Sequence, residues 1–111
     1  MTRSWGARIA VTGTSMRPTL EPGDWLLVDP DAYRRRPPRP GHLVVAPDPR
    51  EPGRMLVKRV AAIDIDGRLL LAGDAREAST DSRTFGAVDP ASVLGRAWFR
   101  VWPRRRFGVL R

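Results

Sequence analysis

The placing of glycine and proline constrains this chain more than any other feature of its sequence. Its 111 residues include 10 glycines and 11 prolines, which cut the apolar sequence into short runs such as WLLV, LVVA and LLLA. Short apolar runs between turn residues are typical of strands, and no long stretch with helical periodicity remains between them. We therefore predict an all-β protein with strands near 8–12, 24–29, 42–47, 54–63, 68–72 and 95–102.

The size and composition of the chain narrow this prediction further. A mass of 12.4 kDa leaves room for one domain, 1–111, which we expect to end in a basic tail at 103–111. No apolar run approaches the roughly 20 residues that cross a bilayer, and the first ten residues lack the apolar core of a secretory signal, so we expect a cytoplasmic protein. Without cysteine and with His42 as the only histidine, a disulfide framework, a zinc ribbon and a thiol nucleophile are excluded, and we expect no metal and no cofactor.

The net charge of +8 favours anionic partners without identifying them. The arginine runs 34–36 and 104–106 could steer an acidic protein or make peripheral contact with anionic lipid, although a solvated surface is the simpler interpretation. A second hypothesis is a nucleic-acid-binding β-barrel without catalysis, in which bases stack on Trp98, Phe99 and Trp102.

Lys58 is the only lysine among 20 basic residues. Arginine keeps its proton at any relevant pH, whereas a desolvated lysine can become a neutral amine and act as a base. Alternation along the predicted strand puts Leu56, Lys58 and Val60 on one face, with Arg59 on the other. If the face that carries Lys58 is the core face, the amine of Lys58 is a candidate base. If the Arg59 face is buried instead, or if Lys58 extends from a sheet edge, the single lysine needs no functional explanation in a sequence biased toward arginine.

The segment VTGTSMRPTL at 11–20 contains the candidate nucleophile, Ser15, on an expected tight turn fixed by Pro18. The nucleophile elbow of α/β-hydrolases needs glycine two residues after the serine, where this chain has Arg17. A Ser-His-Asp triad would need His42, which has no evident acidic partner and is interpreted as an ordinary residue at a strand edge. The polar stretch 73–88 reads by itself as a loop.

Taken together, four blocks of the chain resemble the type I signal peptidase family of Ser-Lys proteases. They are GTSMRPTLEPGDWLLVD at 13–29, PGHLVVAP at 40–47, VKRVAA at 57–62 and AGDAREASTDSRTFGAV at 72–88. The resemblance implies a partly open β-barrel of short antiparallel strands, of the kind shared by LexA and signal peptidases. It also implies a serine endopeptidase that removes an N-terminal leader or propeptide from a precursor protein.

The same resemblance assigns roles to individual residues. Ser15 would be the nucleophile and Lys58 its general base, while Ser79 would hold the lysine by a hydrogen bond and Asp81 would pair with Arg83. Gly13 stands where some members carry a hydroxyl that helps bind the oxyanion, so the backbone N–H of Ser15 would do most of this work. Substrate is expected to bind as an added strand that contacts Thr14, Met16 and Val57.

The small size of the chain and its ending, VWPRRRFGVLR, resemble the maturation proteases of nickel-type superoxide dismutase. This resemblance implies that the partner is a dismutase precursor whose short N-terminal extension is removed, with no nucleic acid expected. A general signal-peptidase-like processing enzyme stays open as an alternative. Self-cleavage of the LexA type is less favoured because no Ala-Gly site preceded by a DNA-binding segment lies upstream of Ser15. An inactive homologue is also less favoured, because both dyad positions are filled.

Overall fold

The computed structural model describes residues 7–51, 53–75 and 87–111, and its regular elements are nearly all strands. In chain order these are β1 (Ala7–Ala10), β2 (Trp25–Asp29), β3 (Leu43–Pro47), β4 (Met55–Ile63), β5 (Leu69–Ala72), the 3-10 turn η1 (Pro90–Ser92), β6 (Gly95–Trp102), the 3-10 turn η2 (Arg104–Arg106) and β7 (Gly108–Val109). The six predicted strands are confirmed, with both ends of each within two residues of the prediction.

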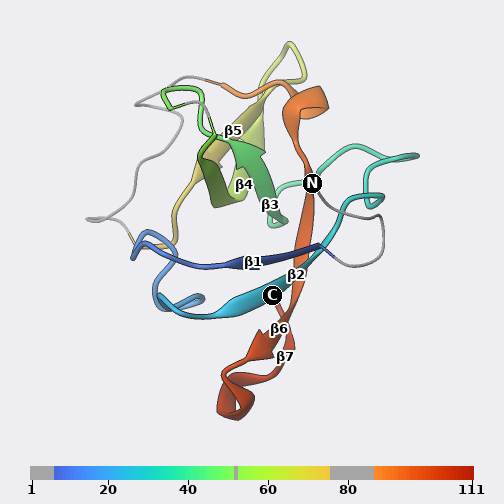
Figure 1. Ribbon diagram of the computed structural model, residues 1–111. Coiled ribbons are helices and arrows are strands. Elements are labelled where there is room, and N and C mark those ends of the chain that lie inside the picture. Colours follow the sequence, from blue (N-terminus) through green and yellow to red (C-terminus); the bar gives the residue numbers. More distant parts are fainter. Residues whose placement is uncertain (1–6, 52, 76–86) are drawn as a thin grey trace.

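All seven strands belong to one antiparallel sheet in the order β1-β2-β6-β3-β4-β5, with β7 paired to β6. The long strand β6 joins two parts of the sheet, since it pairs with β2 along most of its length and with β3 only at Gly95 and Arg96. Figure 1 shows β1 and β2 lying across one end of the β3-β4-β5 layer, with β6 running between them. The sheet therefore curls around itself without closing, which confirms the expected all-β, partly open architecture.

Gly95 permits the close crossing at which β6 passes from β3 to β2. A Cβ atom at this position would lie 2.6 Å from the backbone oxygen of Asp29 and 2.8 Å from a methyl carbon of Val28. Because both distances are below van der Waals contact, any larger residue would push β6 away from β2.

Two apolar clusters hold the two parts of the sheet together. The larger cluster lies beneath the segment that follows β1 and consists of Val11, Met16, Leu20, Leu26, Val28, Leu43, Val45, Ala97 and Leu110. The smaller cluster packs the opposite face of β3 to β5 and consists of Val44, Val60, Leu69, Leu71 and Val88. Strand β3 contributes to both clusters, which explains why four consecutive apolar residues, Leu43 to Ala46, are all buried.

The segment expected to be a basic tail is part of the fold. It forms η2 and then β7, which pairs with β6 at Phe99 and Arg100, and Leu110 enters the larger core cluster. The sequence predicted no element here because the strand has only two residues and follows an arginine run. Among the described residues, no helix has the length and hydrophobicity that a membrane span requires.

Candidate active site

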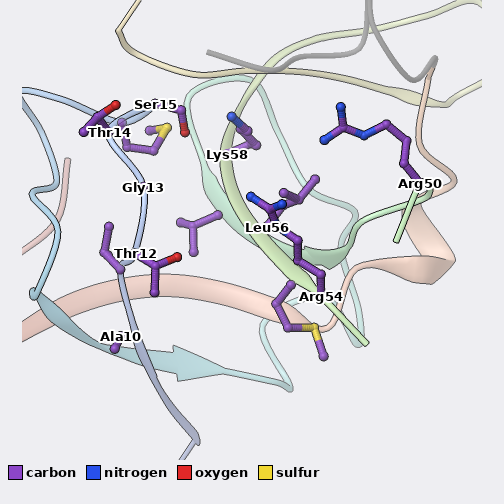
Figure 2. Close-up of a pocket in the computed structure, with 13 residues that line it drawn as sticks. Ala10, Thr12, Gly13, Thr14, Ser15, Arg50, Arg54, Leu56 and Lys58 are labelled. Atoms are coloured by element: carbon purple, nitrogen blue, oxygen red, sulfur yellow. The ribbon is translucent and has the colours of Figure 1, made fainter. Parts of the chain in front are cut away.

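A cavity of about 150 Å³ lies between the segment that leaves β1 and the first half of β4. One wall is made by residues 10–16 and the other by Arg50 and residues 54–58. Ser15 and Lys58, which are 43 residues apart in the sequence, stand on opposite walls. Figure 2 shows the hydroxyl of Ser15 and the amine of Lys58 pointing toward one another across the cavity.

Lys58 lies on the buried face of β4. Its side chain is 3% exposed, and Leu56 and Val60 on the same face are 7% and 1% exposed, whereas Arg59 on the opposite face is half-buried. The alternation inferred from the sequence therefore places the lone lysine inward, as a reactive amine requires. Burial of an amine disfavours its charged ammonium form, which is the property that a general base requires.

Ser15 sits on a loop whose two ends are hydrogen-bonded together. The backbone N–H of Val11 donates to Asp24, and that of Gly23 donates to Val11, both at 2.8 Å. Between these ends, Met16 and Leu20 bury their side chains in the core, with exposed fractions of 2% and 0%. The loop is therefore anchored on both sides of Ser15, which keeps the hydroxyl at the cavity rather than in solvent.

A polar network ties this loop to β4 and to the segment after β5. Asp74 accepts two hydrogen bonds from the guanidinium of Arg59, at 2.9 and 2.8 Å, and one from the hydroxyl of Thr19 at 2.5 Å. The backbone N–H of Ala75 donates to the carbonyl of Ser15 at 2.9 Å. Hydrogen bonds from Arg59 hold the pKa of Asp74 below its usual value, against a smaller opposing effect of burial. Lys58 and its neighbour Arg59 thus lie on opposite faces of β4. Lys58 lines the cavity, and Arg59 belongs to this network.

A second network fixes the far end of the Ser15 loop. The carboxylate of Asp24, only 2% exposed, accepts hydrogen bonds from Arg100 and Arg106 at 3.0 Å each. Arg100 also donates to the carbonyl of Thr19 at 2.9 Å. Because two guanidinium groups surround one buried carboxylate, the charge of Asp24 is compensated and the loop is joined to β6 and η2. This role distinguishes Arg106 from its exposed neighbours Arg104 and Arg105.

Two further arginines stand at the mouth of the cavity. Arg50 and Arg54 both line it, and between them the nearly buried Asp48 accepts from the Nε and Nη2 atoms of Arg50 at 3.2 and 3.1 Å. Hydrogen bonds from Arg50 lower the pKa of Asp48. Asp48 thus holds both arginines at this end of the cavity.

The structure brings most of the predicted site residues to this one cavity. Gly13, Thr14, Met16 and Val57 all line it together with Ser15 and Lys58. Ser79, Asp81 and Arg83 lie outside the described residues. His42 is elsewhere: it stacks on Tyr33 with ring centroids 5.7 Å apart, and its Nδ1 atom lies 2.9 Å from the hydroxyl of Tyr33.

Sequence reasoning missed the two networks that anchor the loop. Their carboxylates, Asp24 and Asp74, each follow a glycine within the blocks that carried the family resemblance, so a signal was present. Their arginine partners lie 15 to 82 residues away along the chain, a separation that no local pattern encodes.

Among the described strands, only β3 pairs with the first half of β4. Strand β4 pairs with β3 from Met55 to Arg59, but its pairing with β5 begins only at Arg59. No described strand covers the other edge of β4 between Met55 and Lys58. Backbone hydrogen bonds along a strand edge are one way in which an extended peptide can bind.

The chemistry that this arrangement supports is covalent catalysis by serine with an amine base. Among the described residues, no cluster of histidine and acidic side chains is placed to hold a metal ion. The hydroxyl and the amine are the two groups that serve as nucleophile and proton acceptor when a peptide is hydrolysed by an acyl-enzyme route.

Known proteins are similar to this chain over most of its length. The family model described as "Signal peptidase, peptidase S26" matches residues 2–64 and 65–102. The mitochondrial ATP-independent inner membrane protease subunit 1a of Arabidopsis thaliana is 35% identical, over 91% of this chain and 73% of the relative. The mitochondrial inner membrane protease subunit 1 of Xenopus tropicalis is 32% identical, over 96% and 75%. The probable signal peptidase I-1 of Synechocystis sp. is 27% identical, over 90% and 73%.

Proposed function

The chain belongs to the signal peptidase family, peptidase S26, and is a serine protease, and from this premise we propose that Ser15 and Lys58 are its catalytic dyad. The observation that carries the proposal is that the only lysine of the chain is buried at a cavity whose opposite wall presents Ser15. Arginine, which supplies every other basic side chain, cannot act as a base at neutral pH.

In this mechanism the neutral amine of Lys58 accepts the proton of the Ser15 hydroxyl while the Oγ atom attacks the scissile carbonyl. The ammonium then gives its proton to the leaving amine as the C–N bond breaks, which leaves an ester on Ser15. A water molecule next gives a proton to Lys58 and attacks this ester, and the proton returns to Oγ as the product acid departs. Every proton that is removed in this cycle is returned, and the only co-reactant is water.

The negative charge that develops on the carbonyl oxygen needs hydrogen-bond donors. We assign this role mainly to the backbone N–H of Ser15, because Gly13 has no side chain to contribute. Thr14, Met16 and Val57 are proposed to contact the peptide on either side of the scissile bond. Ser79 is proposed to hold the lysine, and Asp81 and Arg83 to pair with one another, on the family resemblance alone.

For the substrate, we propose the N-terminal leader of a precursor protein. The precursor of a nickel-type superoxide dismutase is the specific candidate, and it rests on the resemblance of the size and ending of this chain. The relatives reported above are an inner membrane protease subunit in two organisms and a signal peptidase, so leader removal from another precursor is the alternative. Family membership displaces the earlier hypothesis of a nucleic-acid-binding barrel without catalysis.

Co-expression with each candidate precursor tests this proposal, with the mature N-terminus read by mass spectrometry. We expect one defined new N-terminus with the wild-type chain and none with Ser15→Ala. Ser92→Ala is the matched control, because Ser92 lies exposed in η1 and does not line the cavity. Processing that continues unchanged with Ser15→Ala overturns the dyad, whereas Ser15-dependent processing of another precursor only, and not of the dismutase, overturns the substrate assignment.

We also propose that the protein makes peripheral contact with membranes; its cytoplasmic location stays a prediction. Large apolar side chains are exposed on β2, β6 and the turn before β7, including Trp25, Trp102 and Phe107, the last two at 53% and 62%. Trp25 and Trp102 are paired across β2 and β6, and the exposed Arg104 and Arg105 lie beside them in the chain. Aromatic and basic side chains together suit the headgroup region of an anionic bilayer.

Sedimentation with lipid vesicles tests this contact. Wild-type protein should bind vesicles that contain phosphatidylglycerol, and Trp102→Ser with Phe107→Ser should reduce this binding strongly. Ile65→Ser is the control, because Ile65 is fully exposed in the turn between β4 and β5. Equal binding by the double variant and the control contradicts the assignment of this surface.

A further inference from the structure

A second cavity lies away from the protease site, under the loop that joins β2 to β3. It has a volume of about 300 Å³ and is lined by Ala32, Tyr33, Arg36, Pro37, Arg39, His42 and Arg96. Since a water molecule occupies about 30 Å³ in the liquid, this cavity has room for a small polyatomic ligand. None of its lining residues lines the Ser15 cavity, so the mechanism above does not use it.

Three of the lining side chains are guanidinium groups, and no acidic side chain lines the cavity. Within the described part of the chain, none of Arg36, Arg39 and Arg96 forms an ion pair. The acidic residues nearest to the loop arginines along the chain are Asp29 and Asp31. Asp29 lies opposite Arg96 in the register of β2 and β6. Its Oδ1 atom accepts a hydrogen bond from the backbone N–H of Asp31. The cavity therefore concentrates positive charge without compensation from its own walls.

The arginines differ in how they are held, which separates this cavity from an ordinary solvated arginine surface. Arg39 and Arg36 come from the loop, whereas Arg96 projects from the middle of the sheet, where β6 pairs with both β2 and β3. Arg96 is half-buried and lies close enough to the Tyr33–His42 pair to act on both. Burial first, and then Arg96 and Arg39, lower the pKa of His42, so the ring is neutral at neutral pH.

The hydrogen bonds of His42 define which of its atoms can serve a ligand. The backbone N–H of Arg39 points at Nδ1, at 3.4 Å, and the hydroxyl of Tyr33 lies 2.9 Å from the same atom. With Nδ1 acting as acceptor, the neutral ring carries its proton on Nε2. The Nε2 N–H of His42 thus adds a hydrogen-bond donor to those of the three guanidinium groups. In the described residues, the Tyr33–His42 pair contacts the loop backbone and the smaller core cluster.

From these residues we infer a binding site for a phosphate group, formed by Arg36, Arg39 and Arg96 with His42. Guanidinium groups that approach from separate chain segments suit a tetrahedral oxyanion, because each can take a different oxygen. A free phosphate and the headgroup of a phospholipid share this chemistry. The site is independent of the protease mechanism, and its test does not use peptide cleavage.

In the first experiment, the whole protein is titrated with inorganic phosphate at constant ionic strength. Calorimetry and amide chemical shifts measure the binding. We expect saturable binding with shifts at His42 and Arg96, and about tenfold weaker binding in Arg39→Gln and Arg96→Gln, as for the loss of one charge-assisted hydrogen bond. Arg35→Gln is the matched control, since Arg35 is in the same loop but does not line the cavity; it should change the affinity less than about twofold.

Two outcomes overturn the site: no saturable response of the wild type, or an equal loss of affinity in Arg35→Gln and Arg39→Gln. If Arg96→Gln does not fold, as judged by thermal unfolding, Arg36→Gln on the exposed loop replaces it.

The second experiment compares two kinds of phosphatidylcholine vesicle at equal surface charge, one containing phosphatidic acid and the other containing phosphatidylglycerol. Preference for phosphatidic acid that Arg39→Gln abolishes identifies a lipid headgroup, and phosphate binding without this preference identifies a soluble phosphate.

Discussion

At the level of single residues, the proposed mechanism depends on one amine. Lys58 is 3% exposed on the same face as Leu56 and Val60, and it stands across a cavity from Ser15. The strand alternation that predicts this burial is visible in the sequence, because a period of two admits only two faces. The sequence alone leaves open which face is buried, and that choice follows from the cluster in which Val60 packs with Val44 and Leu71.

Two replacements of Lys58 distinguish the effect of its positive charge from its ability to accept a proton. We expect Lys58→Arg, which keeps a cation, and Lys58→Met, which keeps the apolar stem, both to lose about 10²-fold or more in kcat/KM, because neither can accept a proton. Lys58→Met should retain the folded state, since a buried thioether needs no partner. Peptide cleavage rates and thermal unfolding check this. Substantial activity in either variant would contradict the role of the amine.

At the scale of the element, the Ser15 loop is held by carboxylates that belong to distant segments. Asp74 joins Arg59 of β4 to Thr19 of the loop, and Asp24 joins the end of the loop to Arg100 and Arg106. The strands themselves were predictable from short apolar runs between turn residues. These ion pairs were not, because each depends on how the strands are arranged and not on any local pattern.

The Asp74 network predicts a pH-dependent loss of stability. Because Arg59 holds the pKa of Asp74 below its unfolded value, this carboxylate stabilises the fold above the unfolded pKa, and the contribution disappears as the pH falls through the native pKa. We expect Asp74→Asn to cost about 1–2 kcal/mol at pH near 7 and progressively less in acid, since the pair is partly exposed. Urea unfolding over an acidic pH series measures this.

Asp66→Asn is the control for this prediction, because Asp66 lies exposed in the turn between β4 and β5. It should alter stability little at any pH. A difference between wild type and Asp74→Asn that stays constant across the acidic range would show that the charge of Asp74 is not the origin of the effect.

At the level of the whole molecule, one residue near the end of the given chain, Leu110, belongs to the core. The arginines of 103–111 led the sequence interpretation to a basic tail, yet Leu110 is 8% exposed within the cluster that also buries Met16, next to Ser15. A two-residue strand and one buried leucine are too short a pattern to be recognised among exposed arginines. The fold class was predictable, whereas this contact of Leu110 was not. The dyad stays a prediction.

Leu110→Ala tests whether the end of the chain supports the fold. Truncating a buried leucine should lower the free energy of unfolding by about 2–4 kcal/mol. Val109→Ala is the matched control: its side chain is 63% exposed, and we expect a change within about 0.5 kcal/mol. Denaturant unfolding of both variants makes the comparison, and equal stabilities would contradict the placement of Leu110 in the core.

Trapping the covalent intermediate tests whether Ser15 is a nucleophile that Lys58 activates. Wild-type protein is mixed with an activated ester of a short peptide with small side chains, quenched in acid and analysed by intact mass and peptide mapping. We predict one acyl group, located on Ser15, in the wild type and little or none in Lys58→Met or Ser15→Ala. An acyl group on another residue, or equal acylation of Ser15 in Lys58→Met, would contradict it.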